Sequence, residues 1–343
     1  MEMKMKKLDK NMLESFLTKL SGRYVIVAPV INEKGYTEFK CTKDFNRISL
    51  ENNPINTVKE FLFPQNEKLF TFSNGEIIEN INEKKIIVFG ARPCDITSIE
   101  TLDKVFLDER YIDLYYKRRR DNLTIIGYSC PKIEPGCFCM SFGIDPADSA
   151  KSQLFMFEDE DNFYFKTNES EKSDDDGISF ILDGLDESDI DIALLKSGHV
   201  QKSAPDLEFP VDEKKMFSAP VWDEVFSKCI GCGTCTYLCP TCHCFEFYNK
   251  KSDDGVEKIR CWDSCQYSLF TLHASGHNPR NSQKERFRQR VMHKFSYYPK
   301  NYGVVACVGC GRCVRKCPVS LDMRQILGSL ENYIKESVVQ ADG

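Results

Sequence analysis

The stretch CIGCGTCTYLCP, residues 229–240, decides how the second half of this 343-residue chain is organised. It recurs as CVGCGRCVRKCP at residues 307–318, with cysteine, glycine and proline at the same places. Each copy is a C-x2-C-x2-C-x3-C-P run, the spacing by which bacterial ferredoxins hold [4Fe–4S] clusters. The glycines let the backbone approach a bulky group closely. The repeat therefore predicts two [4Fe–4S] clusters.

In two-cluster ferredoxins the fourth cysteine of each run binds the cluster of the other run. The predicted first set is accordingly Cys229, Cys232, Cys235 and Cys317. The predicted second set is Cys307, Cys310, Cys313 and Cys239. The alternative is a pair of zinc ribbons, which need two C-x2-C hooks and no third cysteine at the same step. The long spacer between the runs resembles that of helical ferredoxin domains in multisubunit reductases.

The composition indicates an ordinary globular protein in which cysteine binds metal. A net charge of −6 argues against a nucleic-acid binder, which would usually be basic. No apolar run reaches the roughly 18 residues of a membrane span, and no signal-peptide core follows the basic N terminus. We therefore expect a cytoplasmic location, where disulfides are rare and 17 cysteines point to metal.

The N-terminal half alternates between predicted strands and helices. Apolar runs at 23–31, 84–90 and 123–129 are predicted strands, and the helix DITSIETLDKVFLD connects the last two. Such a strand–helix–strand unit places two parallel strands in one sheet. Hairpins are predicted at 68–80, where Asn-Gly forms the turn, and at 153–167.

These elements predict an α+β protein of two domains. A mixed α/β domain spans residues 1–215, and a mainly helical ferredoxin-like domain with short helical pieces around the cysteine runs spans 216–343. The polar, proline-containing stretch 196–219 is the predicted linker. The first twenty residues are predicted to form an amphipathic helix, whose apolar face holds Leu13, Phe16, Leu17 and Leu20.

Four more cysteines converge on one edge of the predicted sheet. Cys94 and Cys130 each follow the C-terminal end of one of the two parallel strands, where open α/β sheets bind ligands. Cys137 and Cys139 lie in a short loop that begins at this edge. Together these four, the third set, satisfy the ligand count of a third [4Fe–4S] cluster. The alternatives are a zinc site and buried structural thiols.

Five cysteines remain outside the three sets: Cys41, Cys242, Cys244, Cys261 and Cys265. The last four could bind another metal as C-x-C…C-x3-C. They could also pack against the clusters and hydrogen-bond their sulfurs. We favour this second interpretation because the spacing fixes no coordination geometry.

Charged and polar side chains outside the cysteines give weaker signals. Arg286 and Arg290 lie one turn apart on a predicted helix, 282–294, that begins with a capping box. A charge run of this kind usually forms a solvated face. The alternative is that these cations favour reduced clusters or dock an acidic partner; the basic run 117–120 has the same two interpretations. The five histidines show no metal-binding spacing, and no phosphate loop or dinucleotide fingerprint is present.

From about residue 54 to 328 the sequence resembles the iron–sulfur beta subunits of sulfhydrogenase-type [NiFe] hydrogenases and the related A subunits of anaerobic sulfite reductases. The resemblance is carried by ARPCDI, the CFC of PGCFCMSFG, CPTCHCFEF, RCWDSCQ, GHNPR and CVGCGRCVRKCP. The family pattern covers all three sets together with Cys242, Cys244 and Cys265, which are candidate metal ligands. Cys41 and Cys261 depart from it, which weakens any four-thiol site that includes Cys261.

The resemblance implies a non-catalytic electron-transfer subunit of an oxidoreductase complex. Its expected partners are a flavin-containing NAD(P)H-reactive subunit and a catalytic subunit that holds nickel–iron or siroheme. The catalytic residues of the overall reaction would lie in those other chains. Two rival hypotheses are a redox enzyme whose third-set cluster binds substrate and a redox-sensing scaffold. The PGCFCMSFG and WDSCQ segments are slightly closer to the hydrogenase subunits.

Overall fold

The computed structural model describes residues 2–81, 84–147, 151–168, 175–192, 195 and 213–339. Contacts within the chain divide it into two compact units that interleave along the sequence. Unit 1 comprises Met1–Leu62, Asn82–Glu134 and Gly143–Ser203, and unit 2 comprises Phe63–Ile81, Pro135–Phe142 and Ala204–Gly343. The domain ranges 1–215 and 216–343 stay a prediction, although three segments of the first range (63–81, 135–142 and 204–215) are assigned to unit 2. Most of the predicted linker, 196–212, lies outside the described residues.

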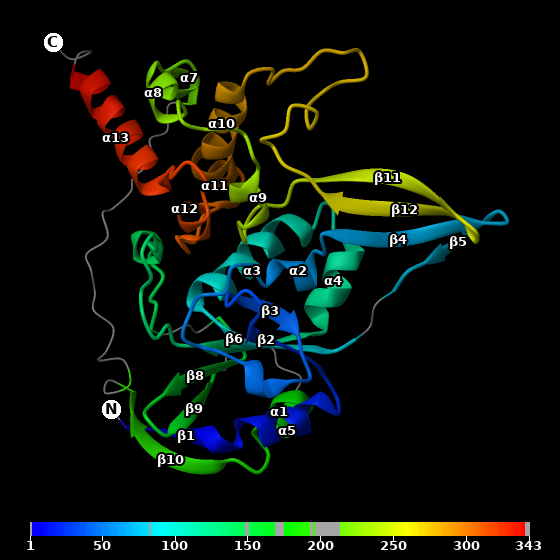
Figure 1. Ribbon diagram of the computed structural model, residues 1–343, viewed down its shortest axis with the longest axis vertical. Helices are drawn as coiled ribbons and strands as arrows, with labels where there is room; N and C mark the ends of the chain where they lie inside the picture. The colour runs from blue at the N-terminus through cyan, green and yellow to red at the C-terminus, as the bar shows by residue number, and fades with distance from the viewer. Residues whose placement is uncertain are drawn as a thin grey trace. The chain divides into compact units, whose positions relative to one another are not determined.

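Unit 1 is built on a mixed sheet of eight strands (Figure 1). In spatial order the strands are β10 (Asp186–Asp191), β1 (Glu2–Asp9), β9 (Asn162–Thr167), β8 (Leu154–Glu158), β7 (Leu123–Tyr128), β6 (Ile86–Ala91), β2 (Val25–Ile31) and β3 (Thr37–Cys41). β2, β6, β7 and β8 pair in parallel, and the remaining pairs are antiparallel. The three predicted strands and the hairpin at 153–167 are confirmed.

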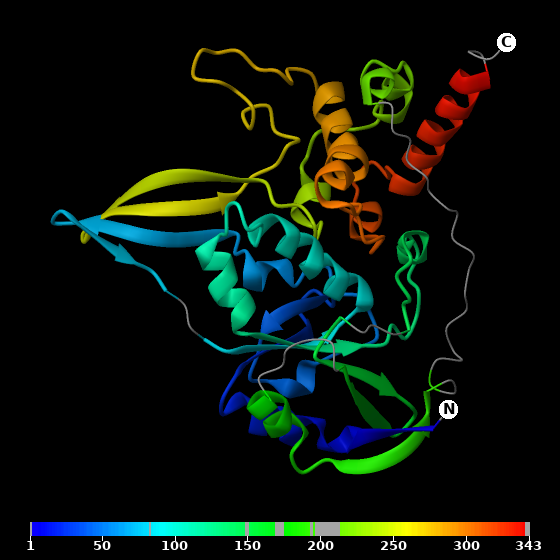
Figure 2. The same ribbon diagram turned by 180° about the vertical axis from the view of Figure 1, so that it is seen from behind.

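Helices cover both faces of this sheet (Figures 1 and 2). They are α1 (Leu13–Ser21), α2 (Lys59–Leu62), α3 (Pro93–Phe106), α4 (Leu114–Asp121) and α5 (Asp175–Leu182), with 3-10 turns η1 (Lys10–Met12) and η2 (Phe45–Arg47). α3 crosses over between β6 and β7, which confirms the predicted strand–helix–strand unit. Phe16 and Leu17 of α1 share a buried cluster with Ile87 and Phe89 of β6. α1 and α5 therefore lie on one face, and α3 and α4 lie on the other.

The N-terminal segment is only partly helical, which corrects the prediction. Residues 2–9 form β1, and the helix begins at Leu13. The alternation of methionine and lysine in EMKMKKLD has the period of a strand, and Met5 and Leu8 are buried. The predicted apolar face of the helix is confirmed, because Phe16, Leu17 and Leu20 are buried.

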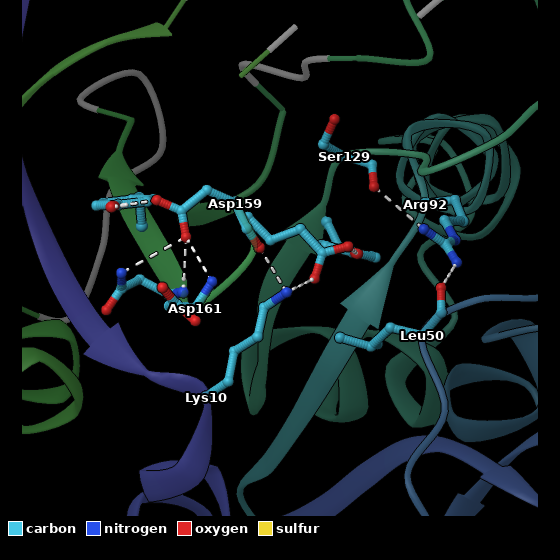
Figure 3. Close-up of polar contacts among 10 residues, drawn as sticks. Lys10, Leu50, Arg92, Ser129, Asp159 and Asp161 are labelled. Carbon is cyan, nitrogen blue, oxygen red and sulfur yellow. Dashed lines mark hydrogen bonds and ion pairs between the residues drawn. The ribbon is translucent and has the colours of Figure 1, made fainter. Parts of the chain in front are cut away.

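Backbone and side-chain bonds tie the end of β1 to the turn between β8 and β9 (Figure 3). The Lys10 N–H donates to the Asp161 carbonyl at 2.9 Å, and its ammonium donates to the Asp159 carbonyl at 2.6 Å. The ammonium also lies 2.8 Å from the Glu158 carboxylate. The N-terminal strand, which lies between β10 and β9, is therefore anchored at its C-terminal end.

Unit 2 contains a second sheet that the sequence analysis did not predict. Its order is β11 (Phe245–Ser252), β12 (Gly255–Trp262), β4 (Asn66–Ser73) and β5 (Glu76–Glu79), all antiparallel. The predicted β4–β5 hairpin is confirmed, with Asn74 and Gly75 in the left-handed region at φ 53° and 86°. The β11–β12 hairpin corrects the expectation of short helical pieces throughout this part of the chain.

The other secondary-structure elements described in unit 2 are helical. Its elements are η3 (Cys139–Phe142), α7 (Glu213–Phe217), α8 (Val221–Val225), α9 (Thr234–Tyr237), α10 (Gln283–Met292), the π-helical turn η4 (His293–Tyr297), α11 (Tyr298–Tyr302), α12 (Arg312–Arg315) and α13 (Met323–Val339). The predicted capping box is present, since Ser282 and Glu285 bond each other reciprocally. Trp222 lies in a buried core with Val291 of α10 and Leu330 of α13.

Candidate functional site

The two cysteine runs fold alike. In each, the second glycine takes a left-handed conformation, with φ 75° at Gly233 and 72° at Gly311, and a single helical turn follows. These turns, α9 and α12, pack against each other. The sequence repeat is therefore also a repeat in structure, because glycine alone adopts this conformation without strain.

The second run lies against the loop that carries Cys137 and Cys139. The Phe138 N–H donates to the Gly309 carbonyl at 2.7 Å. A Cβ atom at Gly309, whose φ is 58°, would collide with the backbone of Phe138 and Cys139. The Arg315 guanidinium lies 3.3 Å from the Cys137 sulfur. Close backbone contact thus joins two segments that are about 170 residues apart in the sequence. Cys137 Sγ also donates to the carbonyl of Cys310, 173 positions away.

The four cysteines of the first set line one cavity of unit 2, together with Cys313 of the second set, Arg290 and the apolar ring of Phe287. Three come from the first run and the fourth, Cys317, comes from the end of the second run. Two of the sulfurs accept hydrogen bonds. Gln283 Nε2 lies 3.5 Å from Cys229 Sγ, and the Leu321 N–H lies 3.3 Å from Cys317 Sγ. Thiols, backbone glycines and donors to sulfur form the surroundings that an iron–sulfur cluster requires.

The second set is more deeply enclosed. Cys239 and Cys310 are buried, and burial raises the pKa of Cys307 to about 11 and that of Cys313 above its usual range. The charge of Cys239 acts on both of these thiols and also on Cys235 of the first run, so the assignment of Cys239 to the second set stays a prediction. A hydrogen bond from the Cys242 thiol lowers the pKa of Cys239 well below its ordinary value.

Helix α10 and the turn after it bring two cations to these cysteines. Arg290 Nη1 donates to Cys242 Sγ at 3.1 Å, and Nη2 donates to the Cys235 carbonyl at 2.8 Å. Lys294 Nζ donates to Thr241 Oγ1 at 2.7 Å and to the Ala306 carbonyl. The predicted solvated face is therefore wrong for Arg290, whose side chain is buried.

Lys294 and Thr241 were not among the predicted site residues. Lys294 could have been predicted to lie near Arg290, because it follows Arg290 by four residues and residues at this spacing share a helix face. Thr241 carried no signal of its own in the sequence. The basic run of α4, by contrast, contains the surface ion pair Lys117–Asp121, and Arg120 pairs with Asp103.

Three of the five cysteines outside the predicted sets take part in hydrogen bonds between thiols. Cys242 bonds Cys239, and Cys244 bonds Cys265, which lowers the pKa of Cys265 to about 6. Cys261 lies 3.4 Å from a Glu246 carboxylate oxygen, and Cys41 is exposed. Among the described residues, no three His, Cys, Asp or Glu side chains surround a point where a single ion would sit. The assignment of Cys242, Cys244 and Cys265 as metal ligands stays a prediction.

The third set is divided between the two units. In unit 1, Cys94 is buried at the start of α3 and Cys130 follows β7, so both lie at the C-terminal edge of adjacent parallel strands, as predicted. Arg92, two residues before Cys94, donates to the carbonyl of Ser129, the residue before Cys130, at 3.1 Å (Figure 3). It also donates to the Leu50 carbonyl. Cys137 and Cys139 belong to unit 2. The shared third cluster stays a prediction.

Comparison with known proteins shows which family the chain is similar to. Residues 228–321 match the family model of a 4Fe-4S dicluster domain. The chain is 30% identical over 339 residues to the sulfhydrogenase 2 subunit beta of Pyrococcus furiosus, covering 94% of this chain and 96% of the relative. The chain belongs to the family of sulfhydrogenase beta subunits.

Membership of the sulfhydrogenase beta-subunit family makes this protein an iron–sulfur subunit with [4Fe–4S] centres, and confirms the resemblance found in the sequence. No solved structure matches the chain. None of the helices that the structure describes has the length and apolar character needed to cross a bilayer.

Proposed function

We propose that this chain relays electrons between a flavin-containing NAD(P)H-reactive subunit and a catalytic subunit that holds nickel–iron or siroheme. The observation that carries the proposal is one cavity lined by Cys229, Cys232, Cys235 and Cys317, which Cys313 of the second run also lines. These residues come from both runs, as the exchange of the fourth ligand requires. The family relationship to a sulfhydrogenase beta subunit supports the same assignment and favours the nickel–iron partner.

The proposal assigns Cys307, Cys310, Cys313 and Cys239 to a second cluster. Each bound cluster supplies a site that accepts and releases one electron. The chain's own residues hold the sulfurs in place, exclude water and donate hydrogen bonds to sulfur. Gln283 and Leu321 donate to the first set, and Thr241 lies 3.2 Å from Cys239 in the second. Such bonds and burial set the reduction potential.

Iron analysis of anaerobically prepared protein tests the ligand sets. Two clusters per chain contain about 8 iron atoms, and three contain about 12. Cys232→Ser and Cys310→Ser should each lower the iron content and change the EPR spectrum of the reduced protein. If neither substitution changes the iron content, the assigned sets are wrong.

Electron flow tests the relay. In the complex purified with its partners, NAD(P)H should reduce the clusters, and the isolated chain should stay oxidised with NAD(P)H while dithionite reduces it. Reduction of the isolated chain by NAD(P)H would contradict the proposal. Metal and cofactor analysis of the co-purified subunits separates nickel from siroheme and so identifies the catalytic partner.

A further inference from the structure

Arg290 and Lys294 are two buried cations, with side chains in residues only 2% and 3% exposed. A charge that is removed from water needs compensation from an opposite charge or from hydrogen bonds. The described partners of both side chains are sulfur, hydroxyl and carbonyl groups, and none is a carboxylate. Two positive charges therefore lie among cysteines without a carboxylate counterion in the part of the chain that the structure describes.

The two cations are distributed unequally between the two sets. Lys294 lies at the second set, because its ammonium donates to the carbonyl of Ala306, the residue before Cys307, and the charges of Cys239 and Cys307 act on it. The Thr241 hydroxyl links the two, since it contacts Lys294 Nζ at 2.7 Å and Cys239 Sγ at 3.2 Å.

Arg290 lies between the sets instead. It lines the cavity of the first set and bonds the Cys235 carbonyl. The charges of Cys239 and Cys313, both of the second set, also act on it. Lys294 and Arg290 thus both lie beside the second set, whereas of these two only Arg290 lies at the first set.

The local backbone explains why Lys294 points inward. Helix α10 widens into the π-helical turn η4, in which the Tyr298 N–H donates to the His293 carbonyl. The next bond of this pattern would run from residue 299 to the Lys294 carbonyl, but Pro299 has no N–H. The Ala306 N–H donates to that carbonyl instead, at 2.9 Å. In turn, the carbonyl of Ala306 accepts a hydrogen bond from the Lys294 ammonium. Proline and the π turn together fix Lys294 against the start of the second run.

We propose that Lys294 and Arg290 give the cluster held by the second set the higher reduction potential of the two, so that an electron in unit 2 resides there. Reduction adds one negative charge to a group already bearing thiolates, and nearby buried cations stabilise the more negative state. The inference rests on the ligand sets of the proposed function. It adds which of the two clusters has the higher reduction potential, and it attributes the difference to the side chains of Lys294 and Arg290.

Anaerobic redox titration of the full chain, followed by EPR, tests the inference. Lys294→Gln should lower the potential of one signal so that its reduced-to-oxidised ratio at a fixed potential falls at least tenfold, equivalent to about 59 mV for one electron. Arg290→Gln should lower both signals. The matched control is Lys284→Gln, because Lys284 lies on the same helix but pairs with Asp223 at the surface. Lys284→Gln should move neither signal. Equal shifts of both signals in Lys294→Gln, or no shift, would overturn the inference.

A second measurement keeps the inference testable if the Lys294 variants do not assemble. In otherwise unchanged protein, Cys310→Ser should remove or alter the higher-potential signal, and Cys232→Ser should alter the lower-potential one. The reverse assignment refutes the order of potentials. An error in the assigned ligand sets can be distinguished from an error in the order of potentials, because it would leave the iron content unchanged in both cysteine variants.

Discussion

At the residue scale, Thr241 connects a cation to a predicted ligand through one hydroxyl group. Its Oγ accepts from Lys294, lies 3.2 Å from Cys239 Sγ and donates to the Ala306 carbonyl at 2.7 Å. The cysteines could be predicted from their spacing, because cluster geometry restricts where ligands fall along the chain. Thr241 could not, because its role depends on Lys294, which follows it by 53 residues and lies in the turn η4 after α10.

Replacing this hydroxyl gives the first prediction. Thr241→Val keeps the shape of the side chain but removes the acceptor of Lys294, so a buried donor loses a partner at a cost of about 1–3 kcal/mol. The melting temperature under anaerobic conditions should fall. Thr241→Ser retains the hydroxyl and should melt close to the wild type. Equal melting temperatures for the valine and serine variants would show that the hydroxyl contributes nothing.

The second prediction concerns Gly309, where the backbone is left-handed and a methyl group has no room. Gly309→Ala should destabilise the protein by about 1–3 kcal/mol through backbone strain, with a further cost from the collision with Phe138. Gly328→Ala is the control, since Gly328 lies within α13 with open space around it. That substitution should stabilise the helix by about 0.5–1 kcal/mol. Thermal melting that shifts the same way in both variants would contradict the argument.

At the scale of elements, β4 and β12 are joined by a buried ion pair. Arg260 donates to Glu67 Oε2 from Nε at 3.0 Å and from Nη2 at 2.5 Å, and both side chains are almost fully buried. The guanidinium also lies over the rings of Phe63 and Phe245, at 5.1 and 5.6 Å from their centroids. The pair fixes the register of two strands that are far apart in the sequence.

The third prediction follows from this burial. Arg260→Met leaves the Glu67 carboxylate buried without its cation and should cost about 3–5 kcal/mol. Adding Glu67→Leu should recover most of that loss, because an apolar pair of similar volume often replaces a buried ion pair without penalty. The neighbouring Lys68–Glu257 pair is partly exposed, so Lys68→Met should cost less than about 1 kcal/mol. Anaerobic thermal melting compares the variants. Additive losses in the double variant would contradict the prediction.

The β11–β12 hairpin shows why some elements escape sequence analysis. Most of β11 is exposed, so it lacks the alternation of apolar and polar residues that marks a half-buried strand. The remaining signal is Asp253-Asp254 followed by Gly255 at the turn. β6 and β7 were predictable because strands buried on both faces are almost continuously apolar.

At the scale of the whole molecule, the units interleave because long-range contacts override chain continuity. The bonds between Glu67 and Arg260 join residues 193 positions apart. A composition change marks a linker but does not reveal that an early hairpin pairs with a late strand. The candidate site divides in the same way. The tandem runs lie within unit 2 and were predictable as a repeat, whereas the third set takes two cysteines from each unit.

The fourth prediction tests whether the four cysteines of the third set bind one cluster. If Cys94, Cys130, Cys137 and Cys139 hold a third cluster, Cys94→Ser should lower the iron content from about 12 to about 8 atoms per chain. Cys41→Ser is the matched control, since Cys41 is an exposed thiol in the same unit and outside every predicted set. It should leave iron unchanged. Because Cys137 contacts the second run through Arg315 and Cys310, Cys137→Ser should also be compared. An equal loss of iron in Cys94→Ser and Cys137→Ser ties both units to one cluster. Loss in Cys137→Ser alone would instead assign this thiol to the second run and leave Cys94 as a structural residue of the sheet edge.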